Sequence, residues 1–151
     1  MRVKRLIAGA LAITAAGFGW TMNTEGTENR THELVADFGR GETPAVGYTD
    51  AIAQAVALLE NNPSYVIVIE GHSGTRGPDS ATMAMSERRA ARVLDDLDDA
   101  GIELPRTRVF AKGESEPLPQ FDGEADNAYQ ARLNRVELYI IHENIDPESV
   151  L

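Results

Sequence analysis

Residues 65–69 constrain the fold of this chain more than any other part of the sequence. This run, YVIVI, is wholly apolar and rich in β-branched side chains. It lies between the helix-breaking segment NNP at 61–63 and a glycine-rich loop, so it is too short for a helix. A continuous apolar run of this length is typical of a strand that is buried on both faces. The sequence therefore predicts a central strand that other elements cover.

Helical periodicity occurs on both sides of this strand. Before it, one apolar face is predicted by residues spaced three and four apart: Tyr48, Ile52, Ala55, Val56 and Leu59. Thr43 and Pro44 favour a helix start just before that face, as N-cap and first helical residue. After the strand, a longer helix over residues 80–100 is predicted by a second stripe: Met83, Ser86, Ala90, Val93, Leu94 and Leu97. Gly101 is the expected stop.

The order of the elements predicts the fold class. Further strand-like runs occur at residues 34–38, 108–111 and 136–141, and a short helix is expected at 125–133. The order β-α-β-α-β-(α)-β favours helices packed against a mixed sheet. The predicted class is therefore α+β, with two main helices on one face of a mixed sheet of about four strands.

The N-terminal segment differs in character from the rest of the chain. Arg2, Lys4 and Arg5 precede an uncharged apolar run at residues 6–20, and the small residues at 14–16 complete the pattern of a secretory signal. The run is shorter than the roughly 20 residues that a membrane-spanning helix needs. We expect residues 1–22 to form a signal peptide or N-terminal anchor, 23–33 a polar linker, 34–143 the folded domain and 144–151 a polar tail.

Charge and cysteine content exclude several classes of function. The chain carries 24 acidic against 14 basic residues, a formal net charge of −10. Binding nucleic acid through phosphates needs a basic face, so we expect no nucleic-acid partner. With no cysteine, thiolate catalysis and cysteine-ligated zinc are excluded. We expect no cofactor, and contact with a membrane only through the N-terminal segment.

The loop at residues 71–78, GHSGTRGP, allows an enzymatic alternative. A strand that delivers Ser73 at a sharp turn is similar to the nucleophile elbow of α/β-hydrolases. That pattern needs glycine two residues after the serine, where this chain has Thr75, and a triad would depend on His142. The chain is also too short for the sheet of such hydrolases. We therefore expect no catalytic residues and no enzyme.

The pattern for metal binding is also weak. None of the three histidines has a second histidine two or four positions away, as a pair of ligands on one element would show: His32, His72 and His142. Four carboxylates crowd the end of the second predicted helix: Asp95, Asp96, Asp98 and Asp99. They lack the glycine turn of a calcium loop, so we interpret them as a solvated acidic surface and expect no metal site.

A longer pattern is more specific than either of these. Residues 70–77 read EGHS followed by three residues and glycine, and residues 85–93 read MS-x-x-RA-x-x-V. This pattern resembles the OmpA-like C-terminal domain family, which associates with peptidoglycan in Gram-negative envelopes and typically reads EGHTD-x-x-G and N-x-x-LS-x-x-RA-x-x-V. The likeness extends over roughly residues 35–141 and includes KGESEP at 112–117 and NRVE at 134–137.

The resemblance implies a ligand and a set of binding residues. The ligand is diaminopimelate of the peptidoglycan stem peptide, which carries an ammonium and a carboxylate on one carbon. Such a zwitterion needs a fixed guanidinium and a fixed carboxylate, and Arg89 stands at the arginine position of the family. The peptidoglycan-binding positions implied by the resemblance are Ser73, Gly74, Thr82, Arg89 and Arg135.

Half of this recognition set departs from the family pattern. Gly74 stands where the family has the aspartate that holds the ammonium, Thr82 replaces an asparagine, and residues 133–135 keep only one arginine of the family's NRR. Losing one partner of a desolvated charge pair costs about 2–5 kcal/mol, so weak binding is expected. Glu70 or Asp79 could replace the aspartate only if the loop bends differently. We expect Glu70 to end the strand and Asp79 to cap the second helix.

These observations predict a non-catalytic module of the Gram-negative cell envelope, in the periplasm or at the outer membrane, that associates weakly with peptidoglycan. The alternative is an OmpA-like domain that has lost cell-wall binding and acts as a structural or protein-interaction module, with an envelope protein as its partner. Binding to isolated sacculi separates the two hypotheses.

Overall fold

A computed structural model describes residues 31–151, so the signal peptide or anchor and most of the linker expected from the sequence lie outside the described residues. The elements follow one another in the order β1 (His32–Asp37), α1 (Tyr48–Asn61), β2 (Tyr65–His72), α2 (Asp79–Asp99), β3 (Thr107–Gly113), α3 (Asp126–Leu133) and β4 (Arg135–His142). Two short 3₁₀ turns, η1 (Leu104–Arg106) and η2 (Pro147–Val150), complete the described part of the chain.

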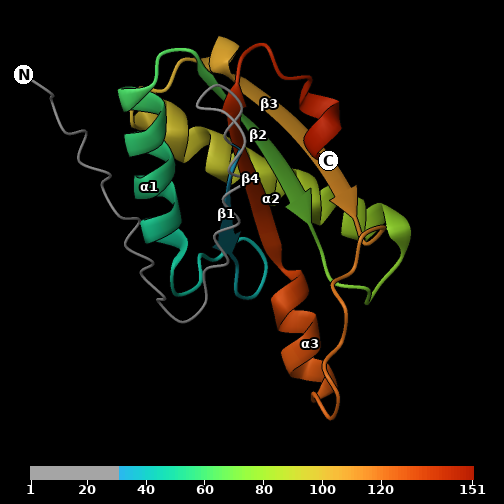
Figure 1. Cartoon of the computed structure of the whole chain (residues 1–151). Helices are drawn as coiled ribbons and strands as arrows, with labels where there is room; N and C mark the ends of the chain where they lie inside the picture. Colours follow the sequence, from blue (N-terminus) through green and yellow to red (C-terminus); the bar gives the residue numbers. More distant parts are fainter. Residues whose placement is uncertain (1–30) are drawn as a thin grey trace, which may run out of the picture.

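The strands form one mixed sheet. Its order is β1-β4-β2-β3, with β4 antiparallel to both of its neighbours and β2 parallel to β3. Both long helices, α1 and α2, lie on the same side of the sheet, and α3 projects beyond the end where β4 begins (Figure 1). The predicted α+β fold with two main helices on one face of a mixed sheet is confirmed.

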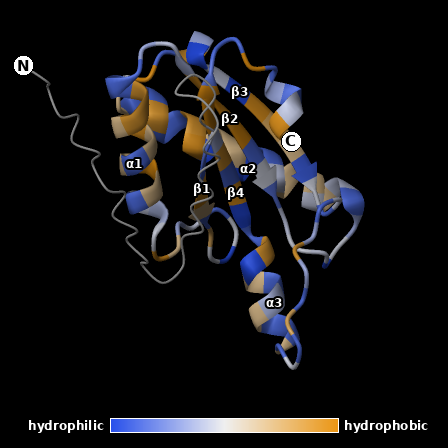
Figure 2. Cartoon of the chain, in the orientation of Figure 1, coloured by the Kyte–Doolittle hydropathy of each residue, from blue (hydrophilic) through white to orange (hydrophobic). Residues whose placement is uncertain are grey.

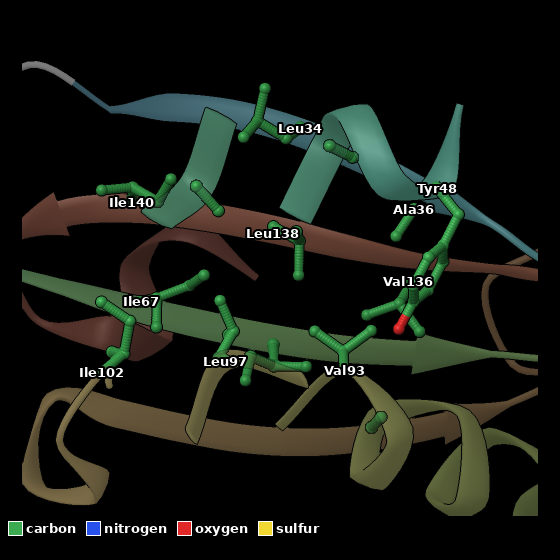
Figure 3. Packing of buried hydrophobic residues seen from close by; sticks show 14 of the residues in the cluster. Leu34, Ala36, Tyr48, Ile67, Val93, Leu97, Ile102, Val136, Leu138 and Ile140 are labelled. Atoms are coloured by element: carbon green, nitrogen blue, oxygen red, sulfur yellow. The ribbon is translucent and has the colours of Figure 1, made fainter. Parts of the chain in front are cut away.

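The hydrophobic core lies between the sheet and these two helices. Alternate residues of the strands point toward the helices, as the two-residue period of a strand requires: Leu34, Ala36, Ile67, Ile69, Val136, Leu138 and Ile140. Figure 3 shows the labelled members of this set, all but Ile69, beside Val93 and Leu97 of α2. The apolar faces of α1 and α2 are turned toward the sheet, while α3 is largely hydrophilic (Figure 2).

A glycine allows α2 to lie against β2. A Cβ atom at Gly71 would be 2.2 Å from the backbone oxygen of Ser86 and 3.1 Å from the Cβ of Ala90. No side chain fits at that distance, so glycine at position 71 permits the close approach of strand and helix. This contact fixes the end of β2, where the glycine-rich loop begins, against α2.

The start of α1 differs from the prediction. The helix begins at Tyr48, with Gly47 as its N-cap at a φ of 94°. Pro44 instead forms a bridge with Phe38, and Ala45 N donates to Asp37 O at 2.9 Å. The segment from Thr43 therefore folds back along the end of β1, and the expected helix start at Thr43 and Pro44 is wrong, because tertiary pairing outweighs the local capping preference.

Two other local expectations were also wrong. Glu70 does not end a strand, because β2 continues to His72 and Glu70 pairs with Glu137 of β4. Asp79 does not cap α2, because it is the first helical residue and Pro78 occupies the N-cap position without a side-chain cap. At the termini of the described part, β1 begins at His32 instead of Leu34, and the tail contains η2. Within residues 31–151, no helix has the length and apolar character needed to cross a membrane.

Candidate functional site

Arg89 lies on the face of α2 that packs against the sheet, and its side chain is only 2% exposed. Its Nε donates to the carbonyl oxygen of Gly41 at 2.9 Å, and its Nη1 donates to the carbonyl oxygen of His72 at 3.0 Å. The guanidinium also lies 5.8 Å from the ring centroid of Phe38. Arg89 therefore joins the loop after β1 to the end of β2, directly before the glycine-rich loop.

The charge of Arg89 has no close carboxylate partner. Among residues 31–151, no carboxylate oxygen lies within ion-pair distance of its guanidinium, and the neighbouring Glu42 is paired with Arg88 at 2.6 Å. Burial lowers the pKa of Arg89 to about 10. The side chain thus keeps its positive charge at neutral pH in a place where only backbone carbonyls of the described chain compensate it, which favours an anionic ligand.

The glycine-rich loop after β2 is largely exposed and is hydrogen-bonded to α3. The backbone N–H of Thr75 donates to Gln130 Oε1 at 3.0 Å, and Gln130 Nε2 donates to the Thr75 hydroxyl at 2.9 Å. Arg76 is paired with Asp126 at the start of the same helix. A Cβ atom at Gly74 would lie 2.6 Å from Gln130 Oε1. The place of the family's aspartate is therefore next to a glutamine side chain of α3.

The other positions implied by the resemblance are engaged elsewhere. The backbone N–H of Ser73 donates to Gly113 O at 2.8 Å. Thr82 is 4% exposed, and its hydroxyl donates to the backbone oxygen of Asp79 at 3.0 Å. Arg135 binds Glu137 Oε1 through its Nε at 2.6 Å. Ser73 and Gly74 thus follow directly after His72, whose carbonyl accepts a hydrogen bond from Arg89. The Thr82 hydroxyl, in contrast, is bound within its own helix.

Arg135 lies on the face of the sheet that the helices do not cover. Val136, Leu138 and Ile140 point into the helix-covered core, so the alternating residues of β4 point the other way. Arg135 and Glu137 are among these, whereas Arg89 approaches from the helix side. The two arginines therefore do not form one pocket in this structure.

The opposite face carries a group of buried polar side chains that the sequence analysis missed. Glu70 and His72 of β2 are each 1% exposed, and His72 Nε2 lies 3.2 Å from Glu70 Oε1 and 3.7 Å from Glu137 Oε2. Glu70 and His72 are two positions apart on one strand, which places both side chains on the same face. That spacing was visible in the sequence, but the expected end of β2 before His72 concealed it.

The electrostatics of this group centre on Glu137. Burial raises the pKa of the Glu137 carboxyl, but the hydrogen bond from Tyr139 and the charge of Arg135 together outweigh burial and lower it below its ordinary value. Burial, together with the hydrogen bond to Glu137, raises the pKa of the Tyr139 hydroxyl well above its ordinary value. Glu137 is therefore ionised at neutral pH, and Tyr139 is a neutral donor to it.

The geometry does not support the hydrolase alternative. Ser73 follows the end of β2, whereas His142 ends β4 and pairs with Tyr65 at the start of β2. Strands rise about 3.3 Å per residue, so the two side chains are roughly 25 Å apart, at opposite ends of the sheet. Ser73 and His142 cannot act together as nucleophile and base.

Comparisons with known proteins agree with the motif. A family model described as the OmpA family matches residues 46–133. The peptidoglycan-associated lipoprotein of Brucella melitensis is 35% identical over 73 residues, which cover 48% of this chain and 44% of that protein. The peptidoglycan-associated lipoprotein of Legionella pneumophila is 27% identical over 115 residues, which cover 76% of this chain and 64% of that protein. The matched region thus spans less than half of the Brucella protein and under two thirds of the Legionella protein.

Among solved structures, the peptidoglycan-associated lipoprotein from Burkholderia pseudomallei is similar in fold. Its TM-score is 0.63 at 21% sequence identity, and the superposition covers 71% of this chain and 89% of that chain. At this identity the likeness concerns the fold, and it agrees with the mixed sheet and helix arrangement described above.

Proposed function

The family model matches more than half of the chain, so the protein belongs to the OmpA family, and on that premise we propose that it associates with peptidoglycan in the bacterial cell envelope. The family consists of non-enzymatic modules. The relatives from Brucella melitensis and Legionella pneumophila are named as peptidoglycan-associated lipoproteins, which supports an envelope location in a Gram-negative bacterium, in the periplasm or at the outer membrane.

The ligand that we propose is the diaminopimelate of the stem peptide. The observation that carries this proposal is Arg89, a buried guanidinium next to the glycine-rich loop, with no carboxylate of residues 31–151 in ion-pair distance. Its Nε and Nη1 are held by the carbonyls of Gly41 and His72, which leaves Nη2 for a carboxylate. A guanidinium fixed in this way loses little entropy when it binds a ligand.

We propose that binding is weak because the partner for the ammonium is missing. Gly74 has no side chain, and the nearest groups to the place of an aspartate are the side-chain amides of Gln130 and Asn134. Glu70 does not supply the carboxylate, because it is buried beside His72 on the other face of the sheet. The absent charge costs about 2–5 kcal/mol relative to a complete pair.

The test is retention of the purified protein on isolated sacculi, with free diaminopimelate as competitor. We expect retention that the competitor reduces, and that Arg89→Lys reduces further, because lysine cannot reproduce the two fixed hydrogen bonds of the guanidinium. Arg88→Lys is the matched control: Arg88 is the neighbouring arginine and is 50% exposed. Retention that neither the competitor nor Arg89→Lys changes would refute this ligand.

A restoring variant tests the explanation for weak binding. Gly74→Asp alone would bring its Cβ against the flexible end of Gln130, so the variant to test combines Gly74→Asp with Gln130→Ala. We expect at least about a tenfold gain in sacculus affinity from the restored charge pair. Gln130→Ala alone is the control and should give no such gain. A double variant that folds normally and binds no better would show that Gly74 is not the cause.

One observation favours the second candidate function, a structural or protein-interaction module. Arg89 is almost fully buried, and Gln130 of α3 is hydrogen-bonded to Thr75 of the glycine-rich loop, so a ligand that reaches Arg89 must displace part of the chain. If folded wild-type protein shows no diaminopimelate-dependent retention on sacculi, this second function replaces the first.

A further inference from the structure

We propose that Glu70, His72 and Glu137 form a binding site for a divalent cation of the zinc class. The three residues lie on the face of the sheet opposite α1 and α2, at the end of β2 and the start of β4. Glu70 is directly opposite Glu137 in the register of the two antiparallel strands. Cross-strand pairs place their Cβ atoms about 5 Å apart, so the two carboxylates and the imidazole share one small volume.

The distances between the ligand atoms suit a single ion. One ligand atom from each of the three residues lies within 4.8 Å of the other two. His72 Nε2 is 3.2 Å from Glu70 Oε1 and 3.7 Å from Glu137 Oε2. Two ligands held at about 2.0–2.1 Å from a tetrahedral zinc ion are about 3.3 Å apart, so small side-chain movements would complete the geometry.

Burial leaves several of these atoms without partners. Glu70 and His72 are 1% exposed. Glu70 Oε2 and both ring nitrogens of His72 are buried without a hydrogen-bond partner among residues 31–151. A buried carboxylate and imidazole lose the hydration of their polar atoms, and the 3.2 Å approach of His72 Nε2 to Glu70 Oε1 compensates this loss only in part. Metal coordination would satisfy these atoms where the chain does not.

The charges of the neighbouring residues leave room for a cation. Arg135 is bound to Glu137 at 2.6 Å. Lys112 lies 3.9 Å from Glu70 but only 2.8 Å from Glu116, so its closer ion pair is with Glu116. Glu70, Glu116 and Glu137 thus place three carboxyl groups beside two cationic side chains, and the neutral form of His72 is the one that binds metal.

Hydrogen bonds from two neighbouring side chains already orient one of the ligands. Glu137 accepts hydrogen bonds from Arg135 on Oε1 and from Tyr139 on Oε2, the latter at 2.5 Å. Such hydrogen bonds hold the carboxylate of a ligand in position before the ion binds. Three protein ligands with two carboxylates and one imidazole leave a coordination position for water, as in open zinc sites.

The test is titration of the chelator-treated full chain with Zn²⁺, using a chromogenic chelator as competitor. We expect one equivalent to bind, with a rise in melting temperature that follows the Zn²⁺ concentration. Glu70→Gln should lower the affinity at least about 100-fold, since it removes a ligand charge at nearly constant volume. His72→Asn should do the same, which provides a second variant if the first fails to fold.

The matched control is the double variant His142→Asn with Glu143→Gln. It removes a different histidine and glutamate, which are neighbours in the sequence where β4 ends. It should change the Zn²⁺ affinity less than about threefold, since this pair lies outside the proposed site. Absence of Zn²⁺ binding at 100 μM by folded wild-type protein, a concentration about 100 times a micromolar Kd, would overturn the proposal. Equal affinity in wild type, Glu70→Gln and His72→Asn would overturn it too, because the ion would then lie elsewhere.

Discussion

The two faces of the sheet differ in how they are stabilised. On the helix-covered face, β4 contributes Val136, Leu138 and Ile140, all fully buried in the apolar core. On the other face the same strand contributes Arg135 and Glu137, which are paired with each other beside buried Glu70 and His72. The helix-covered face is held by hydrophobic burial, whereas the other face combines buried Val68 and Ile141 with a nearly dry group of side chains that depends on charge compensation.

This difference indicates where function can reside. Apolar packing supplies stability but offers no chemistry, whereas buried charges must be paired and therefore respond to ligands and pH. Arg89 is an intermediate case: it lies on the helix-covered side, yet it is charged and lacks a carboxylate partner among residues 31–151. We expect the apolar face, the polar face and the surroundings of Arg89 to respond differently to mutation.

The largest effect is expected on the apolar face. Leu138→Ala should lower the free energy of unfolding by about 4 kcal/mol, because it leaves a cavity in the centre of the core. Urea unfolding monitored by circular dichroism measures this. Leu104→Ala is the control, since Leu104 is 54% exposed, and it should cost less than about 0.5 kcal/mol. An equal loss of unfolding free energy in the two variants would mean that Leu138 does not lie in the hydrophobic core.

The next effect is expected on the polar face. Arg135→Met should cost about 3 kcal/mol at pH 7, because it leaves the Glu137 carboxylate largely buried without its guanidinium partner. The matched control is Arg92→Met, which removes an exposed pair with Asp96 and should cost much less. If the two variants cost the same, the polar face behaves as ordinary surface.

The pH dependence sharpens the same comparison. The folded state lowers the pKa of Glu137 below its ordinary value of 4.5, so the stability it contributes is present above pH 4.5 and is lost as pH falls through the lower folded value. The cost of Arg135→Met should therefore shrink at pH 3, while the cost of Leu138→Ala stays within error. Urea unfolding at pH 7 and pH 3 measures both, and a constant cost of Arg135→Met would contradict the charge pairing.

A smaller effect is expected where β2 meets α2. Gly71→Ala should cost about 2 kcal/mol, because its Cβ would meet the backbone oxygen of Ser86 and force strand and helix apart. Gly39→Ala is the control, since a Cβ there would make only an ordinary contact at 3.5 Å with Thr43 O. Thermal unfolding of the two variants distinguishes them. A Gly71→Ala protein as stable as the control would show that the helix does not pack this closely.

Much of the fold was predictable because the apolar face determines it. The continuous apolar run at residues 65–69 indicates a strand buried on both faces, and the helical stripes indicate helices that each bury one face. The start of α1 was not predictable in this way, since Thr43 and Pro44 favour a cap locally but are drawn into a bridge with Phe38. No local sequence preference predicts that these two residues pair.

The site was predictable only in part. The motif indicated that Arg89 lies near the glycine-rich loop, and its contact with the carbonyl of His72 agrees with this. The near-complete burial of Arg89 and the hydrogen bonds between Gln130 and the glycine-rich loop could not be predicted from the sequence, because both depend on how α2 and α3 pack. The group of Glu70, His72 and Glu137 was missed because it requires strand register, which places Glu70 opposite Glu137.

The most direct test of the central claim is a calorimetric titration with a diaminopimelate-containing stem peptide. A stem peptide with lysine in place of diaminopimelate lacks the distal carboxylate and serves as the ligand control. We predict that wild type and Arg88→Lys bind the diaminopimelate peptide alike, that neither binds the lysine peptide measurably, and that a folded Arg89→Lys variant binds at least about tenfold more weakly, a loss of about 1.4 kcal/mol. Equal binding of both peptides, or equal affinity of Arg89→Lys and wild type for the diaminopimelate peptide, would contradict a role for Arg89 in holding the cell-wall carboxylate.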